Sequence, residues 1–266
     1  MGTHSKPGFT IIETMLVLAI TGVLIATLLF GVGSSVTTQR YSDSVTSFRS
    51  LLQDQYSQVS NVSNDRGSGW TCGDDGKATP VQSGTSTPGQ SHCVLLGRYV
   101  SIVAGDVSIA TVIGYPTSLA PAVASDMQTI KDNYALGISK SSVETKTLEW
   151  GAQIAWPTTG SGAKSPTTPR SIAILFLRSP DSGTTYTFTS NDVTPISSFS
   201  ESTLKDMMQE TTAGFPGQGQ RTICVEPGAQ VPEKFAVYIT PYANGPGSIE
   251  TRTYATTAAL EGDSKC

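Results

Sequence analysis

The hydrophobic pattern changes twice along the chain. From Thr14 to Gly33 no residue carries a charge, and an apolar run of this length can cross the hydrocarbon core of a membrane as a helix. Apolar residues then recur every three or four positions, at Tyr41, Val45, Phe48, Leu52, Tyr56, Val59 and Val62. This spacing is typical of an amphipathic helix with one buried face. Beyond residue 64, short stretches rich in β-branched residues alternate with turn residues.

These two helical patterns predict one continuous helix. No proline interrupts the chain from Phe9 to Asn64, and a helix of roughly 55 residues would be about 80 Å long at 1.5 Å per residue. The stop and turn residues Asn64-Asp65-Arg66-Gly67 are expected to end it. We expect its first part to be covered by lipid or by neighbouring helices, and its second part to pack on a globular body.

The rest of the chain predicts a β-rich body. Hairpins are expected over 94–115, 171–189 and 234–256, together with a strand over 221–226 and two short strands over 143–156. A short helix is expected from Ser125-Asp126 to Tyr134. Another is expected to be capped by Ser198 and Glu201 and to reach about Thr211. Residues 67–92 and 157–169 are expected to be a loop over the helix and a surface linker. The fold class is therefore α+β, with a long N-terminal spine helix packed against an antiparallel β-sheet domain.

The residues before the apolar run resemble the processing site of type IV pilins and pseudopilins. They read Lys6-Pro7-Gly8-Phe9-Thr10-Ile11-Ile12-Glu13. The resemblance implies that a prepilin peptidase cleaves after Gly8, that Phe9 becomes the N-methylated first residue, and that Glu13 is the assembly acid in the apolar segment. Gly22 also fits the family, whereas Phe30 stands where a proline is often found. Whether the helix melts on assembly, as that proline permits in some pili, therefore stays open.

The same resemblance implies an organisation and a set of partners. Residues 1–8 would be the leader, 9–33 the transmembrane and assembly helix, 34–64 the amphipathic half of the spine, and 65–266 an extracellular domain. The partners would be copies of the chain or other pilins in a helical filament, the prepilin peptidase, and the assembly platform in the cytoplasmic membrane. The subunit would wait in that membrane with its N-terminus inside, and then enter a surface filament that serves adhesion or twitching motility.

A signal peptide or plain signal anchor is the competing interpretation, with Lys6 as its positive region. The apolar run is too long for the roughly 7–15 apolar residues of a cleaved signal, and Leu28-Leu29-Phe30 offer no Ala-x-Ala site. A charged Glu13 is also rare inside a membrane segment unless it has a partner. These three features favour pilin-type processing.

The charge and the cysteines limit the remaining function classes. With 21 acidic and 17 basic residues, the chain has no broad positive surface for nucleic acid. Four cysteines allow three connectivities, and an even number beyond an exporting segment indicates disulfides in an oxidising compartment. We favour Cys72–Cys93 and Cys224–Cys266, because each joins sequence neighbours. No Cys-x-x-Cys pair and only two histidines are present, so no metal site is expected.

No catalytic constellation emerges from the sequence. There is no Gly-x-Ser-x-Gly elbow and no Walker loop, and Ser202-x-x-Lys205 lacks the motifs that accompany it in enzymes. We therefore expect no cofactor and no enzymatic activity. The leading hypothesis is a major or minor structural pilin. A pseudopilin of a type II-like secretion system, a signal-anchored surface enzyme and a DNA-uptake pilin remain as alternatives.

Overall fold

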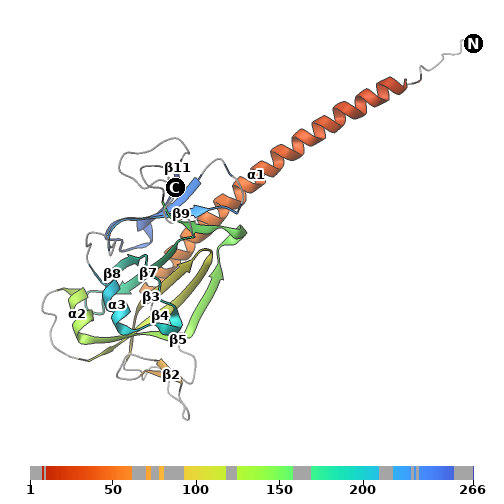
Figure 1. Ribbon diagram of the computed structural model, residues 1–266. Coiled ribbons are helices and arrows are strands. Elements are labelled where there is room, and N and C mark those ends of the chain that lie inside the picture. Colours follow the sequence, from red (N-terminus) through yellow and green to blue (C-terminus); the bar gives the residue numbers. More distant parts are fainter. Residues whose placement is uncertain are drawn as a thin grey trace, which may run out of the picture.

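The computed structural model describes residues 8, 10–61, 70–72, 78–80, 93–117, 125–157, 169–209, 218–228, 231, 234–254 and 266. Its dominant element is the 50-residue helix α1 (Ile11–Ser60), which projects from a β-rich body in its first part and lies against that body in its second part (Figure 1). The predicted continuous helix is confirmed. It ends where Asn61 leaves helical backbone geometry (φ −92°, ψ 77°) and donates its N–H to the Ser57 carbonyl oxygen at 2.8 Å.

The second part of α1 supplies the centre of the core. Six residues of the predicted stripe have exposed fractions of 2% or less: Tyr41, Val45, Phe48, Leu52, Tyr56 and Val59. Val62, the seventh, lies outside the described residues. Because residues three and four apart share one face of a helix, this spacing alone places all six against the body.

A five-stranded antiparallel sheet forms one side of the body. Its order is β5 (Tyr134–Thr147), β4 (Asp106–Pro116), β3 (Val94–Val103), β7 (Ser171–Arg178) and β8 (Thr185–Ser190). Alternate residues of β7 face opposite ways, as strand geometry requires. Ile172, Ile174 and Phe176 share a core with α1, whereas Ala173, Leu175 and Leu177 share a second core with residues of α2 (Asp126–Asn133) and α3 (Glu201–Met207).

A four-stranded antiparallel sheet covers another part of α1. Its order is β11 (Ile249–Tyr254), β10 (Lys234–Ile239), β9 (Arg221–Glu226) and β6 (Gln153–Ala155). The hydroxyl of Tyr41 donates to the Val225 carbonyl oxygen at 2.5 Å and accepts from the Phe235 N–H at 2.8 Å. One helix therefore holds both sheets, and the antiparallel α+β fold class is confirmed.

Short elements complete the described chain, and two of them correct the predictions. The expected loop at 67–92 contains a small hairpin of β1 (Trp70–Cys72) and β2 (Ala78–Pro80). Helix α3 is capped by Ser200, whose Oγ accepts from the Thr203 N–H at 3.4 Å, and not by Ser198, which belongs to the 3₁₀ turn η2 (Ile196–Ser198). The other 3₁₀ turns are η1 (Glu149–Gly151) and η3 (Pro246–Ser248).

The first of the two short strands expected over 143–156 is also wrong. It is the end of β5, which begins at Tyr134 and pairs with β4 from Pro116 to Asp106. The pairing of β4 with β5 shifts register between Ile109, opposite Glu144, and Thr111, opposite Ser139, so the extra residues of this irregularity lie in β5. The second short strand is β6.

Candidate functional site: the apolar half of the long helix

The start of α1 is fixed by a reciprocal pair of side-chain contacts. Thr10 precedes the first helical residue, and its Oγ1 accepts from the Glu13 N–H at 3.3 Å. In return, Glu13 Oε2 accepts from the Thr10 N–H and from the Thr10 hydroxyl, each at 3.0 Å. This capping box satisfies donors that a helix N-terminus otherwise leaves without partners. It also holds the Glu13 carboxylate at the very start of the apolar segment.

The next 26 residues, 11–36, form the apolar half of α1. Its large apolar side chains that the structure describes are exposed to between 38% and 77% of their area. They are Ile11, Ile12, Met15, Leu16, Val17, Leu18, Ile20, Val23, Leu24, Ile25, Leu28, Leu29, Val32 and Val36. Among the described residues, α1 is the helix long and apolar enough to cross a membrane, and its apolar stretch is not buried in the body. A surface this large and apolar needs a lipid or protein partner.

The sequence analysis placed the processing site and the assembly acid on this segment. Gly8 and Glu13 are described, and Gly8 is exposed with open space around it, whereas Phe9 lies outside the described residues. Thr10 was not predicted to act with Glu13. The signal was present, because Thr-x-x-Glu ahead of an apolar run is the spacing of a capping box.

The cysteines lie on the body, away from the apolar half. The structure joins Cys224 of β9 to Cys266 with a Cα–Cα distance of 5.4 Å. Lys234 Nζ donates to the Cys266 carbonyl oxygen at 3.3 Å, which adds a second contact to this tie. Cys93 is also disulfide-bonded, but the side chain of Cys72 lies outside the described residues, so the Cys72–Cys93 pairing stays a prediction.

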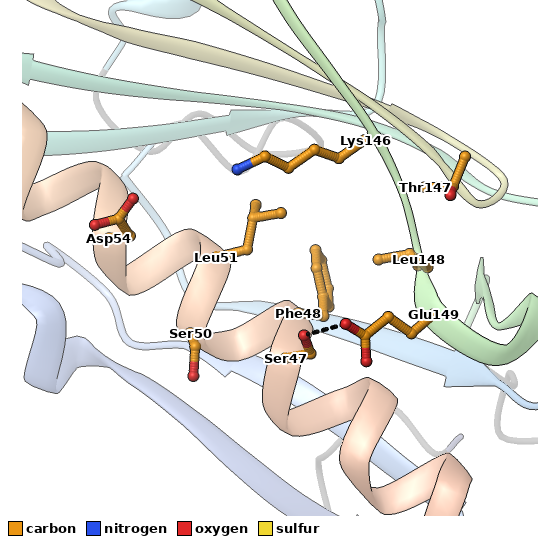
Figure 2. A pocket seen from close by; sticks show the side chains of 9 residues that line it. All are labelled: Ser47, Phe48, Ser50, Leu51, Asp54, Lys146, Thr147, Leu148 and Glu149. Carbon is orange, nitrogen blue, oxygen red and sulfur yellow. Dashed lines mark hydrogen bonds between the residues drawn. The ribbon is translucent and has the colours of Figure 1, made fainter.

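A groove of about 530 Å³ marks the junction between helix and body (Figure 2). Its walls come from α1, from the end of β5, from Leu148 and from the start of η1. The lining residues are Ser47, Phe48, Ser50, Leu51, Asp54, Lys146, Thr147, Leu148 and Glu149. Ser47 Oγ donates to Glu149 Oε1 at 3.1 Å across its lower edge, and Ser44 Oγ donates to the Glu149 carbonyl oxygen at 3.0 Å. These contacts attach the η1 turn to the helix.

The polar lining of the groove consists of three kinds of side chain. Its polar side chains are hydroxyls, one lysine and two carboxylates, and none of them is a histidine or cysteine. Within the described ranges, no group of three or more His, Cys, Asp or Glu side chains is placed to hold a metal ion. Ser202 and Lys205 lie on α3, where Lys205 Nζ pairs with Glu201 Oε1 at 2.7 Å.

A buried polar cluster lies where the two sheets meet. Arg170 Nη1 donates to the Thr222 carbonyl oxygen at 2.7 Å, and the guanidinium groups of Arg170 and Arg221 both donate to Asn191 Oδ1. Burial, followed by the nearby charge of Arg221, lowers the pKa of Arg170 to about 9, and burial lowers the pKa of Arg221 to about 10. This arrangement connects β9 to the chain around β7 and β8, so we assign it to folding.

The fold and the exposed segment together define a class of protein. It is a protein with an apolar N-terminal helix that fits attachment to a membrane or to other helices, and with a folded β-rich body at the other end of that helix. Residues 4–29 match the family model of the prokaryotic N-terminal methylation motif, the signature of type IV pilins and pseudopilins. No curated protein and no solved structure matches the chain significantly. The motif supports a type IV pilin-like or pseudopilin protein.

Proposed function

We propose that the chain is a structural subunit, major or minor, of a type IV pilus-like surface filament. The observation that carries this proposal is the division of α1. The described large apolar side chains of its apolar half are exposed from Ile11 to Val36, whereas the stripe from Tyr41 to Val59 is buried in the core of the body. A stable soluble protein would not leave such a surface bare, so lipid covers it before assembly and neighbouring helices cover it afterwards.

Processing and location follow from the same segment. In this proposal residues 1–8 are the leader, 9–33 the transmembrane and assembly helix, 34–64 the remainder of the spine, and 65–266 the extracellular domain. The prepilin peptidase cleaves after Gly8, and Phe9 is methylated. The assembly platform in the cytoplasmic membrane then extracts the subunit into a filament for adhesion or twitching motility. The Cys224–Cys266 disulfide supports a body outside the cytoplasm, where disulfides persist.

Glu13 would set the register of assembly. A carboxylate in an apolar segment is costly without a partner, and both hydrogen bonds from Thr10 end on one oxygen, Oε2. The amine of an incoming Phe9 can then pair with the Glu13 of a subunit that is already in place. This attraction is stronger in a low-dielectric core than in water, although desolvation offsets much of the gain. Apolar packing of the helices would supply the larger contact area.

A pseudopilin of a type II-like secretion system is the second candidate, because the methylation motif is shared by both groups. The two candidates differ in where the mature chain accumulates. A pilin is recovered in quantity from long surface filaments, whereas a pseudopilin stays with the cell envelope.

The proposal is tested by mass spectrometry of filaments sheared from the cell surface. We expect an abundant mature chain that begins at N-methylated Phe9, and we expect Gly8→Leu to leave full-length protein in the membrane, since a bulky side chain would block the peptidase. Gly8→Ala is the matched control and should be processed. A mature N-terminus beyond Thr27 would mean cleavage by an ordinary signal peptidase and would exclude the pilin assignment.

A further inference from the structure

An exposed tryptophan stands where α1 leaves the body, at the segment we call the neck (residues 37–44). Trp150 of η1 is 58% exposed, although tryptophan usually buries most of its area. The guanidinium carbon of Arg40 lies 4.7 Å from the centre of its ring, and Arg40 is itself exposed. The pair therefore presents an aromatic face and a cation together to the surroundings.

The backbone of η1 is held in a conformation that presents this side chain. Trp150 has φ 57° and ψ 26°, in the left-handed region that bulky residues rarely adopt. Such a conformation persists only where neighbouring contacts enforce it. Here Ser44 and Ser47 of α1 bind Glu149 on one side of Trp150, and the Ala152 N–H donates to the Glu149 carbonyl oxygen at 3.2 Å on the other.

The height of the pair along α1 indicates what it contacts. At 1.5 Å per residue, Arg40 lies about 40 Å beyond Glu13, close to the thickness of a bilayer with its headgroups. The exposed apolar side chains end at Val36, about 6 Å before Arg40. Tryptophan is enriched in this interfacial layer, and arginine extends its cationic end toward it.

Neighbouring charges show which part of a lipid fits. Asp43 and Glu149 are exposed close to the pair, and Lys234 precedes Phe235, whose N–H binds the Tyr41 hydroxyl at the same level. Acids and bases are thus balanced around the neck, which does not favour attraction by net charge. The local cation of Arg40 suits the phosphate of any headgroup, and the indole suits the layer just below it.

We propose that Trp150 and Arg40 contact lipid headgroups at the outer face of the cytoplasmic membrane. This contact holds the body against that face before the subunit enters a filament. This inference rests on the proposed function, because it requires α1 to span the membrane with the body outside. The contact fixes the height of the body above the bilayer. Assembly must break it, so it also gives the membrane-held subunit a defined starting position.

The experiment uses the full-length chain in phosphatidylcholine vesicles whose lipids carry bromine, which quenches tryptophan emission on contact. One set has bromine near the carbonyl end of the acyl chains and the other near the terminal methyl. We expect the wild-type chain to lose more emission to the shallow bromines than Trp150→Phe does, and the two to respond alike to the deep bromines. Trp150→Phe changes an exposed ring, so folding is preserved. Arg40→Gln should weaken the quenching by the shallow bromines.

A second variant separates this inference from the proposed function. Leu24→Trp, in the Trp150→Phe background, places an indole in the middle of the apolar half and should be quenched by the deep bromines. If Leu24→Trp is quenched but Trp150 is not, the helix spans the membrane and the headgroup contact is wrong. The headgroup contact is also wrong if the Trp150 side chain becomes buried only in assembled filaments. If neither position is quenched, membrane anchoring itself fails.

Discussion

Glu13 is a residue on which two different contacts depend. Its Oε2 closes the capping box with Thr10, and its charge is the feature that the proposed filament uses. Glutamine can close a capping box as well as glutamate can, whereas alanine cannot. Substitutions at Glu13 and Thr10 can therefore separate the helix start from the charge.

We expect Glu13→Gln to reduce filament yield nearly as much as Glu13→Ala, because both remove the charge that pairs with Phe9. Thr10→Ala is the matched control. It removes the capping side chain, which lowers the stability of the helix by about 1 kcal/mol, but it keeps the Glu13 carboxylate and should still assemble. Filaments sheared from cells that lack other pilins provide the measurement, alongside the mature chain that remains in the membrane. Wild-type yields from Glu13→Gln would show that the charge has no role in assembly.

Buried tyrosines make the stability of the body sensitive to alkaline pH. Burial raises the pKa of Tyr56 and of Tyr99 to about 12, from a usual value near 10. The folded body thus favours the neutral phenols. Their contribution to stability is complete below about pH 10 and is lost as the pH rises through about 12.

The chain in detergent should accordingly unfold at a lower denaturant concentration as the pH rises from about 10 to 12. Tyr56→Phe should flatten this dependence, at a cost of about 1 kcal/mol at neutral pH for the lost 2.6 Å hydrogen bond to Thr187. Tyr242→Phe, at a side chain that is 64% exposed, is the matched control and should leave the pH dependence unchanged. If the unfolding midpoint of Tyr56→Phe falls with pH as steeply as that of the wild-type chain, Tyr56 is not a source of the pH dependence.

At the scale of elements, the sequence predicted those whose signals are local. The stripe on α1 required only a spacing of three and four. The β7–β8 hairpin required only Pro180-Asp181-Ser182-Gly183 between two stretches rich in β-branched and aromatic residues. The length of β5 and the pairing of β6 with β9 were missed, because partners far apart in sequence leave no periodic mark. The η1 turn, which presents Trp150, was also missed, because the contacts that hold it come from Ser44 and Ser47, far away in the sequence.

The stability of the body should respond differently to a leucine-to-alanine substitution in the two halves of α1. Leu52 is fully buried, so Leu52→Ala should destabilise the body by about 2–5 kcal/mol. Leu24 is 57% exposed on the apolar half, so Leu24→Ala should leave the unfolding of the body unchanged. Denaturant titration in detergent, followed by near-ultraviolet circular dichroism, measures both variants. Equal effects would mean that the apolar half also packs on the body.

At the scale of the whole molecule, Cys224–Cys266 closes a loop across 42 positions and ties Cys266 to the second sheet. In the chain-entropy account a loop of this length stabilises by about 4 kcal/mol. Non-reducing peptide mapping of exported chain should recover the Cys224–Cys266 pair, and Cys224→Ala with Cys266→Ala should lower the unfolding midpoint by a corresponding amount. Free thiols at both positions in exported chain would show that the pairing does not form.

The way the two sheets share α1 also has a consequence for the order in which the exported chain folds as it emerges from the membrane, N-terminal residues first. Tyr56, near the end of the helix, packs on Phe176 of β7 and binds Thr187 of β8. The hydrogen bonds of Tyr41, at the neck, form only after Val225 and Phe235 have emerged, because these residues come later in the chain. The body therefore closes along α1 from its far end toward the neck. An incomplete chain that lacks β9 and β10 leaves the neck side of the stripe bare, which is the kind of surface that chaperones and proteases recognise.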